Sequence, residues 1–204
     1  MGESVSTTLY INDLVGSFLI AHPDIADNRF YKSVIYVVSD KDDKIEGVVI
    51  NKKSAFKFAS LLENVTSALF EKGVTVPPEL NHIQVIRGGP VNNDKLFIIH
   101  TDDYSNPSSL NTNNNILFTT PVSILKDIVE LRGPKQASVY IGNCVWQKES
   151  LLQDIKSNSW FIQKFADPSV VNNYLFNHDI DNLWEDIFKS LGIDQTNISF
   201  FLKG

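Results

Sequence analysis

The most prominent apolar segment of the chain spans residues 33–39, where Val34 to Val38 follow one another without an intervening polar residue. A run of this kind is typical of a strand that is buried on both faces of a sheet. Residues 40–44 are charged, and a second apolar run, Gly-Val-Val-Ile-Asn, returns at residues 47–51. The pattern predicts a β-hairpin with a long polar loop.

A second pair of apolar segments, residues 84–91 and 95–100, is separated by Asn-Asn-Asp at residues 92–94. Asn and Asp tolerate left-handed backbone angles, so the pattern predicts two strands joined by a turn. The first segment is interrupted by Arg-Gly-Gly-Pro at residues 87–90. Two glycines and a proline weaken a strand and are typical of a bulge or of a place where another group approaches the backbone closely.

The rest of the chain alternates between short strands and helices. Apolar residues at three- and four-residue spacing predict helices, and short apolar runs between turn residues predict strands. Further strands are predicted at residues 19–21, 116–119, 137–144 and 160–165, and residues 198–202 are predicted to be a last strand or an apolar tail. Helices are predicted at residues 121–132, 148–156, 168–176 and 182–191, and one helix or a pair of helices from residue 58 to Gly73, with Pro77-Pro78 as an extended linker. Because the connections are short, we expect one domain over residues 1–204, with residues 1–15 as an N-terminal extension.

The composition is that of an ordinary globular protein, with 204 residues, 43% hydrophobic residues and a net charge of −6. The negative charge opposes binding to nucleic acid, and no helix-turn-helix with a basic second helix stands out, although Lys52, Lys53 and Lys57 form a small basic cluster. We therefore expect no direct binding to DNA. The apolar runs are too short to span a bilayer, so we expect no membrane attachment. The single cysteine is typical of a reducing cytoplasm, where we expect the protein to act.

The first candidate site is the segment Arg87-Gly88-Gly89. Glycine permits close approach to the backbone and arginine offers a planar fork of donors, so the segment could bind a small anion through free backbone N–H groups and the guanidinium. A structural bulge that bends the strand into a closed sheet explains the same residues. We favour the bulge, because phosphate-binding loops are longer and lead into a helix.

The second candidate is His100, which ends the strand at residues 95–100 beside two aspartates. A nearby carboxylate could orient the imidazole for proton transfer, although a histidine at a strand end is more often a hydrogen-bonded structural residue. His22 and Asn51 occupy similar strand ends. These three side chains would line one polar cleft only if the fold brings them together.

Cys144 lies in Gly142-Asn143-Cys144-Val145-Trp146, which half resembles a nucleophile elbow. The bulky Trp146 stands where the elbow needs a small residue, so we predict that Cys144 is buried and unreactive. No spacing of His, Cys, Asp or Glu indicates a zinc or calcium site. We expect neither a metal nor a cofactor.

Several segments, in a specific order and spacing, resemble the AlgH/YqgE family of small bacterial proteins from about Gly16 to Gly204. They are Gly16-Ser17-Phe18-Leu19-Ile20-Ala21-His22-Pro23, Gly47-Val48-Val49-Ile50-Asn51, Gly88-Gly89-Pro90-Val91 followed by His100, Gly142 with Trp146 and Leu151, Asn158 with Trp160, and Leu191-Gly192-Ile193-Asp194. The resemblance implies a single α+β domain with a mixed, bifurcated and partly barrel-like sheet surrounded by helices. It supplies no reaction, and some family members are labelled transcriptional regulators.

The chain departs from the family pattern at three places. Family members commonly have His where this chain has Asp40, Pro where it has Lys53, and Gly-Gln where it has Glu149-Ser150. A site that needs that His or Gln would be lost or changed here.

These observations favour a non-catalytic regulatory or binding module that acts through a protein partner or a small anionic ligand. The candidate ligand-binding residues are Asn51, Arg87, Gly88, Gly89 and His100. An enzyme of unknown reaction that uses a polar cleft near His100, and a direct transcriptional regulator, are the alternatives.

Overall fold

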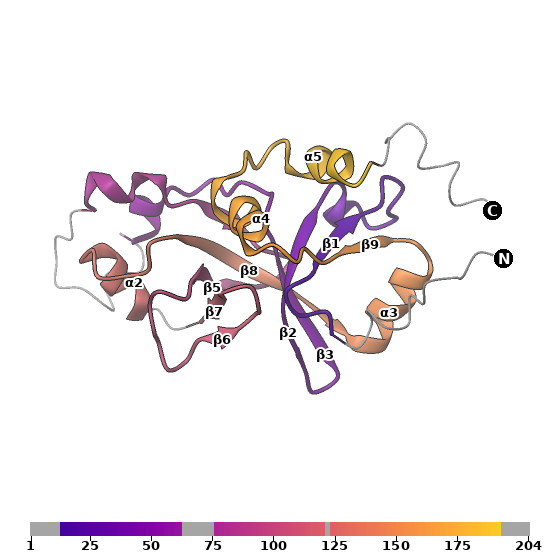
Figure 1. The fold of residues 1–204 in the computed structure, drawn as a ribbon, viewed down its shortest axis with the longest axis horizontal. Coiled ribbons are helices and arrows are strands. Elements are labelled where there is room, and N and C mark those ends of the chain that lie inside the picture. Colours follow the sequence, from indigo (N-terminus) through magenta and orange to yellow (C-terminus); the bar gives the residue numbers. More distant parts are fainter. Residues whose placement is uncertain (1–12, 63–75, 121–122, 193–204) are drawn as a thin grey trace.

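The computed structural model describes residues 13–62, 76–120 and 123–192. Within these ranges nine strands form one sheet in the order β6-β7-β5-β8-β3-β2-β1-β9, with β4 paired to β8 beside this path. The sheet is antiparallel except for the β4–β8 pair and is not closed into a barrel. Figure 1 shows α4 and α5 over the same side of the sheet, and α2 and α3 at opposite ends of the molecule. The fold is therefore α+β, as predicted.

The elements follow one another as the apolar pattern indicates. The strands are β1 (Phe18–Ala21), β2 (Val34–Lys41), β3 (Lys44–Val49), β4 (Val85–Arg87), β5 (Val91–Thr101), β6 (Leu110–Asn111), β7 (Ile116–Thr119), β8 (Ala137–Gln147) and β9 (Trp160–Gln163). The helices are α2 (Ser123–Val129), α3 (Lys148–Lys156), α4 (Pro168–Asn172) and α5 (Leu183–Ser190), with the short turns η2 (Asn28–Phe30), η3 (Pro78–His82) and η4 (Asn173–Asn177). Residues 58–62 are helical as well.

Strand β2 is buried on both faces, as its unbroken apolar run predicts. Val34, Tyr36 and Val38 pack in a cluster with α5, whereas Ile35 and Val37 pack in a second cluster that includes residues of α3. A sheet covered on both sides needs apolar residues at every position of its central strands.

The β2–β3 hairpin forms, but its predicted long loop is wrong. Lys41 pairs with Lys44, so only Asp42 and Asp43 form the turn, with φ of 52° and 57°. Two consecutive positive φ angles define the two-residue turn whose twist matches that of the flanking strands, and aspartate tolerates these angles. The charged residues therefore continue the strand pairing beyond the core.

The hairpin predicted for residues 84–100 is also wrong, because β4 and β5 lie on opposite edges of β8. Val85 of β4 pairs in parallel with Val139 of β8, and Ile98 of β5 pairs with the same residue from the other side. The Asn-Asn-Asp segment is a bulge within β5, where the pairing with β8 shifts. Most residues of β8 are buried, and a central position between two strands satisfies both of its edges.

The chain crosses from one edge of β8 to the other at Gly88 and Gly89. A Cβ atom on Gly88 would lie 2.3 Å from the carbonyl oxygen of Gly142, and one on Gly89 would lie 2.2 Å from the backbone of Asn143. Neither glycine has a positive φ, so the close approach of two backbones, and not an unusual torsion angle, requires them.

The sheet forks at this crossing, as the resemblance implies. Strand β4 pairs with β8 as far as Ile141, and β3 pairs with the same edge of β8 from Cys144 onward. Gly88 joins the two branches, since its N–H donates to the Ile141 carbonyl and its carbonyl accepts from Val49.

Most other predicted elements are present with small shifts in their bounds. The helix at residues 148–156 is α3 without change, and the helix at residues 168–176 is α4 continued by η4. Pro78 does not continue an extended linker but begins the turn η3, because proline is well suited to the first position of a helix. Pro121, the strand at residues 198–202 and the part of the helix beyond residue 62 fall outside the described residues.

We predict that Gly88→Ala and Gly89→Val each lower the free energy of unfolding by about 1–3 kcal/mol or more, because either side chain would overlap the backbone of β8. Asn81→Ala is the control, because Asn81 is exposed on η3 and its side chain does not meet β8. Urea unfolding of the three variants measures the difference. Crossing variants that unfold at the same urea concentration as the parent would contradict the prediction.

Candidate functional site

The fold brings three of the five candidate residues into one cleft of about 520 Å³. Arg87 and Gly89 line it from the crossing segment, and Asn51 lines it from the end of β3. We call it the cationic cleft, because five of its side chains are basic and two are acidic. Its lining is Arg29, Phe30, Lys32, Val49, Asn51, Lys52, Lys53, Arg87, Gly89, Pro90, Asp181, Trp184 and Glu185.

Backbone pairing at the end of β4 places Arg87 in the cleft. The Arg87 N–H donates to the carbonyl of Lys52 over 2.8 Å, and Ser54 donates to the carbonyl of Val85 over 3.1 Å. These bonds dock residues 52–54 against β4, so Lys52 and Lys53 lie beside Arg87. The guanidinium of Arg87 is exposed and has no carboxylate or hydrogen-bond partner among the described residues.

Lys52 is the second cation of the cleft without a carboxylate partner in the described chain. Its Nζ donates to the carbonyl of Tyr31 over 2.8 Å. Partial burial lowers the pKa of Lys52, because the charged form loses hydration there. A bound anion would stabilise the charged form of Lys52 in place of the lost water.

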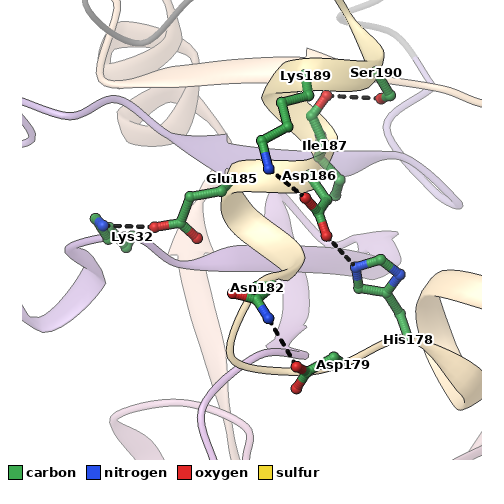
Figure 2. Close-up of polar contacts among 9 residues, drawn as sticks. All are labelled: Lys32, His178, Asp179, Asn182, Glu185, Asp186, Ile187, Lys189 and Ser190. Atoms are coloured by element: carbon green, nitrogen blue, oxygen red, sulfur yellow. Dashed lines mark hydrogen bonds and ion pairs between the residues drawn. The ribbon is translucent and has the colours of Figure 1, made fainter.

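Acidic residues near α5 neutralise two other cations of the cleft. Figure 2 shows the ion pair between Lys32 and Glu185, with 2.6 Å between Nζ and Oε1. Lys53 pairs with Asp181 in the same way. The hydrogen bond from Lys32 to Glu185 raises the pKa of Lys32.

Arg29, at the border of the cleft, is paired with Asp27 over 2.7 Å. The unpaired positive charge of the cleft therefore lies on Arg87 and Lys52.

Asn51 holds the backbone that frames the cleft. Its Oδ1 accepts from the N–H of Val34 and its Nδ2 donates to the carbonyl of Lys32, both over 2.8 Å. The side chain is buried, and both of its polar groups are used. Asn51 therefore positions Lys32 at the cleft rather than offering its own amide to a ligand.

The glycines of the crossing segment shape the wall of the cleft. The N–H of Gly88 is already bonded to β8, so it is not one of the free backbone donors that the anion hypothesis requires. Gly89 and Pro90 form part of the lining. The crossing explains both glycines, and Arg87 supplies the contact that an anion would use.

His100 lies outside the cationic cleft. Its Nδ1 donates to the carbonyl of Thr101 and its Nε2 accepts from the hydroxyl of Thr119, both over 2.8 Å. The side chain is fully buried, and burial lowers its pKa, which favours the neutral imidazole. These contacts match the structural alternative that the sequence left open.

His22 does not reach the cleft either. Its Nδ1 accepts from the N–H of Asp24 over 3.0 Å, and its buried ring stacks on Phe161 with 5.5 Å between ring centres. A shared polar cleft of His22, Asn51 and His100 is therefore wrong, because only Asn51 lines the cleft.

The departures from the family pattern have separate places. Asp40 forms an ion pair with Lys148 over 2.7 Å, which ties β2 to the start of α3. Lys53 lines the cationic cleft, whereas Glu149 and Ser150 are exposed in the first turn of α3. Of these positions only Lys53 belongs to the candidate site.

Sequence reasoning did not find Arg29, Lys32, Asp181 and Glu185 as site residues. Lys32 and Glu185 are 153 residues apart, and no local pattern links them. The pair Lys52-Lys53 was visible as a small basic cluster, but its meaning depends on the pairing of residues 52–54 with β4.

Two further observations concern metal-binding clusters and membrane-spanning helices. Within the described ranges, no three His, Cys, Asp or Glu side chains gather closely enough to hold a metal ion. None of the helices in those ranges has the length and apolar character needed to cross a bilayer.

We predict that Asn51→Ala lowers the free energy of unfolding by about 1–3 kcal/mol, because the N–H of Val34 and the carbonyl of Lys32 lose their partner. Asn81→Ala is the matched control, since Asn81 is exposed on η3. Chemical denaturation of both variants tests this. Equal stabilities would show that the amide of Asn51 is free for another role.

We predict that Cys144 reacts with a thiol reagent far more slowly in the native protein than in denaturant. The side chain is 1% exposed and its Sγ donates to the carbonyl of Gly88 over 3.5 Å. Burial raises the pKa of the Cys144 thiol, so the reactive thiolate is scarce. Native labelling as fast as labelling in urea would contradict this placement.

Comparison with known proteins agrees with the motifs. The sequence model of the AlgH-like family matches residues 18–196. A UPF0301 protein of Mesorhizobium japonicum is 33% identical over 182 residues, which cover 89% of this chain and 88% of the relative. One from a Chelativorans strain is 32% identical over 186 residues, with 91% and 90% covered.

Solved structures resemble the fold. The solution structure of the AlgH protein from Pseudomonas aeruginosa is 26% identical, covers 100% of this chain and 99% of its own, and superposes with a TM-score of 0.72. A crystal structure from Corynebacterium diphtheriae, 17% identical, covers 86% and 85% with a TM-score of 0.61 and shows likeness of fold alone. The family match and the relatives above 30% identity establish that this chain belongs to the AlgH-like family.

Proposed function

We propose that this protein is a non-catalytic binding module that takes a small anionic ligand in the cationic cleft. The observation that carries the proposal is the pair Arg87 and Lys52, two cations in one cleft without a carboxylate partner in the described chain. Lys32, Lys53 and Arg29 are each paired with an acidic side chain. The protein has a net charge of −6, yet unpaired positive charge is concentrated in this cleft. A bound anion would neutralise that charge.

The chemistry of the two cations favours a phosphate or a carboxylate group. The guanidinium of Arg87 presents a planar fork of donors that matches two oxygen atoms of either group. Lys52 adds a point charge whose hydration is already reduced by burial. The volume of the cleft, about 520 Å³, is within the range of small-ligand sites.

The lining of the cleft supports binding more than catalysis. Its described residues include no histidine, cysteine or serine, and its two carboxylates are engaged in ion pairs with Lys32 and Lys53. These groups are the commonest general bases and nucleophiles, and their absence or pairing leaves Lys52, whose Nζ is bonded to the carbonyl of Tyr31, as the group that an enzyme here would use. We therefore place the enzyme alternative second.

We further propose a cytoplasmic regulatory role, in which the bound anion changes how the protein meets a protein partner. The free, buried Cys144 suits a reducing compartment. Direct regulation through duplex DNA is the weaker alternative, since the overall charge is negative and the basic side chains line a concave cleft.

We predict that the protein binds inorganic phosphate or pyrophosphate, and that Arg87→Ala and Lys52→Met each weaken this binding about tenfold, the effect of losing about 1.4 kcal/mol. Methionine keeps most of the apolar stem of Lys52. Isothermal titration calorimetry at low salt measures the affinities, and thermal melts check that the variants are folded.

Lys126→Ala is the control, because this exposed lysine on α2 lies outside the lining of the cleft. It removes the same charge without touching the site. The proposed function is overturned if the parent binds neither anion, or if Arg87→Ala binds pyrophosphate as well as the parent does.

A further inference from the structure

A second hollow of about 460 Å³ adjoins the cationic cleft, and Arg29, Phe30 and Pro90 line both. We call it the aromatic pocket, because Phe30, Trp146 and Trp160 line it. We propose that the two together form one groove for a nucleotide, with the phosphates in the cationic cleft and the base in the aromatic pocket. This inference rests on the proposed function, since the cationic cleft provides the phosphate end.

The aromatic pocket offers a surface for a planar ring. The ring centres of Phe30 and Trp160 are 5.4 Å apart, and those of Phe30 and Trp146 are 5.9 Å apart. Phe30 and Trp160 are buried, whereas Trp146 is only half-buried. The two buried rings hold the wall in place, and Trp146 presents an accessible ring on which a base could stack.

A carboxylate in the aromatic pocket indicates which kind of ring would bind. Asp154 lines the pocket, and its carboxylate has no hydrogen-bond or ion-pair partner within the described chain. Asp154 is half-buried, and this burial, with the nearby charge of Asp27, raises its pKa. A free carboxylate of this kind accepts hydrogen bonds from N–H groups and repels phosphate.

The two ends of the groove therefore have opposite requirements. Arg87 and Lys52 attract anionic oxygens at one end, and Asp154 accepts N–H donors beside an aromatic wall at the other. Inorganic phosphate meets the first requirement only. A purine nucleotide meets both, and guanine is the best match because its edge presents two parallel N–H donors to one carboxylate.

An ion pair and a proline lie at the border between the cationic cleft and the aromatic pocket. Asp27 accepts two hydrogen bonds from Arg29 Nε, at 3.0 and 3.1 Å, and a third from its Nη2, at 2.7 Å. Of the two carboxylates in the described lining of the aromatic pocket, Asp154 is therefore the unpaired one. Pro90, placed by the chain crossing, forms the opposite side of the border.

We test the inference by calorimetry with four probes: pyrophosphate, guanosine, guanosine diphosphate and phosphocholine. We expect the affinity for guanosine diphosphate to exceed that for pyrophosphate by about tenfold or more. Stacking of one base commonly provides a gain of this size. Asp154→Asn should reduce this gain and leave pyrophosphate binding unchanged, because asparagine keeps the shape and leaves the aromatic wall intact but replaces one acceptor with a donor. Glu149→Gln, on the same helix but outside the pocket lining, should change neither affinity.

Tryptophan fluorescence supplies an independent readout of where the base lies. Trp146 and Trp160 line the aromatic pocket, whereas Trp184 lines the cationic cleft. We expect guanosine diphosphate to quench the parent and to quench a folded Trp146→Phe variant much less, while pyrophosphate, which can act only on Trp184, produces the same change in both proteins.

The outcomes distinguish the inference from the proposed function. If pyrophosphate binds through Arg87 and the guanine adds no affinity, the nucleotide inference is overturned and the anion-binding module stands. The assignment of the aromatic pocket to a base is overturned if guanosine diphosphate binds equally well to the parent and to Asp154→Asn. It is also overturned if phosphocholine exceeds pyrophosphate in affinity by as much as the nucleotide does. If pyrophosphate does not bind, the proposed function itself fails, whatever guanosine does.

Discussion

The rest of the structure depends on one close contact between two stretches of backbone. In this contact, Gly88 and Gly89 pass over Gly142 and Asn143 of β8. A Cβ at either crossing glycine would lie less than 2.5 Å from the atoms of β8. Atoms at that separation repel strongly, so the chain can change edges of β8 here only without side chains. Gly142, on the β8 side of the contact, is constrained as well. Its φ is +73°, and a Cβ there would lie close to the carbonyl oxygens of Gly89 and Val91.

The crossing makes the fork in the sheet, and the fork makes the cleft. Strand β4 leaves β8 at Arg87, and β3 takes its place from Cys144 onward. Where the two branches separate, residues 52–54, which follow β3, dock on β4 by backbone hydrogen bonds. The cations of the site are therefore carried by backbone that strand pairing holds in place, which limits the entropy that a ligand would have to remove on binding.

Charge is distributed unevenly around this fork. The chain as a whole is acidic, yet the cleft gathers five cations, and only part of their charge is neutralised by Asp181 and Glu185 near α5. On the other side of α5, Asp186 contacts His178 and Lys189 and does not reach the cleft (Figure 2). The arrangement is consistent with a site in which a bound anion neutralises the positive charge that the acidic residues leave unpaired.

The sequence by itself determined the local elements. The unbroken run at Val34–Val38 predicts a strand buried on both faces, and the apolar spacing of residues 148–156 predicts α3 without error, because the periodicity of side chains depends only on local backbone geometry. The Gly-Gly-Pro break was also visible. Only the tertiary structure decided that β4 and β5 flank β8, that His100 is buried with both ring nitrogens bonded, and that Lys32 meets Glu185 from 153 residues away. Strand partners and the lining of a cleft are set by long-range packing between segments, and the order of residues along one segment carries no record of which other segment will lie against it.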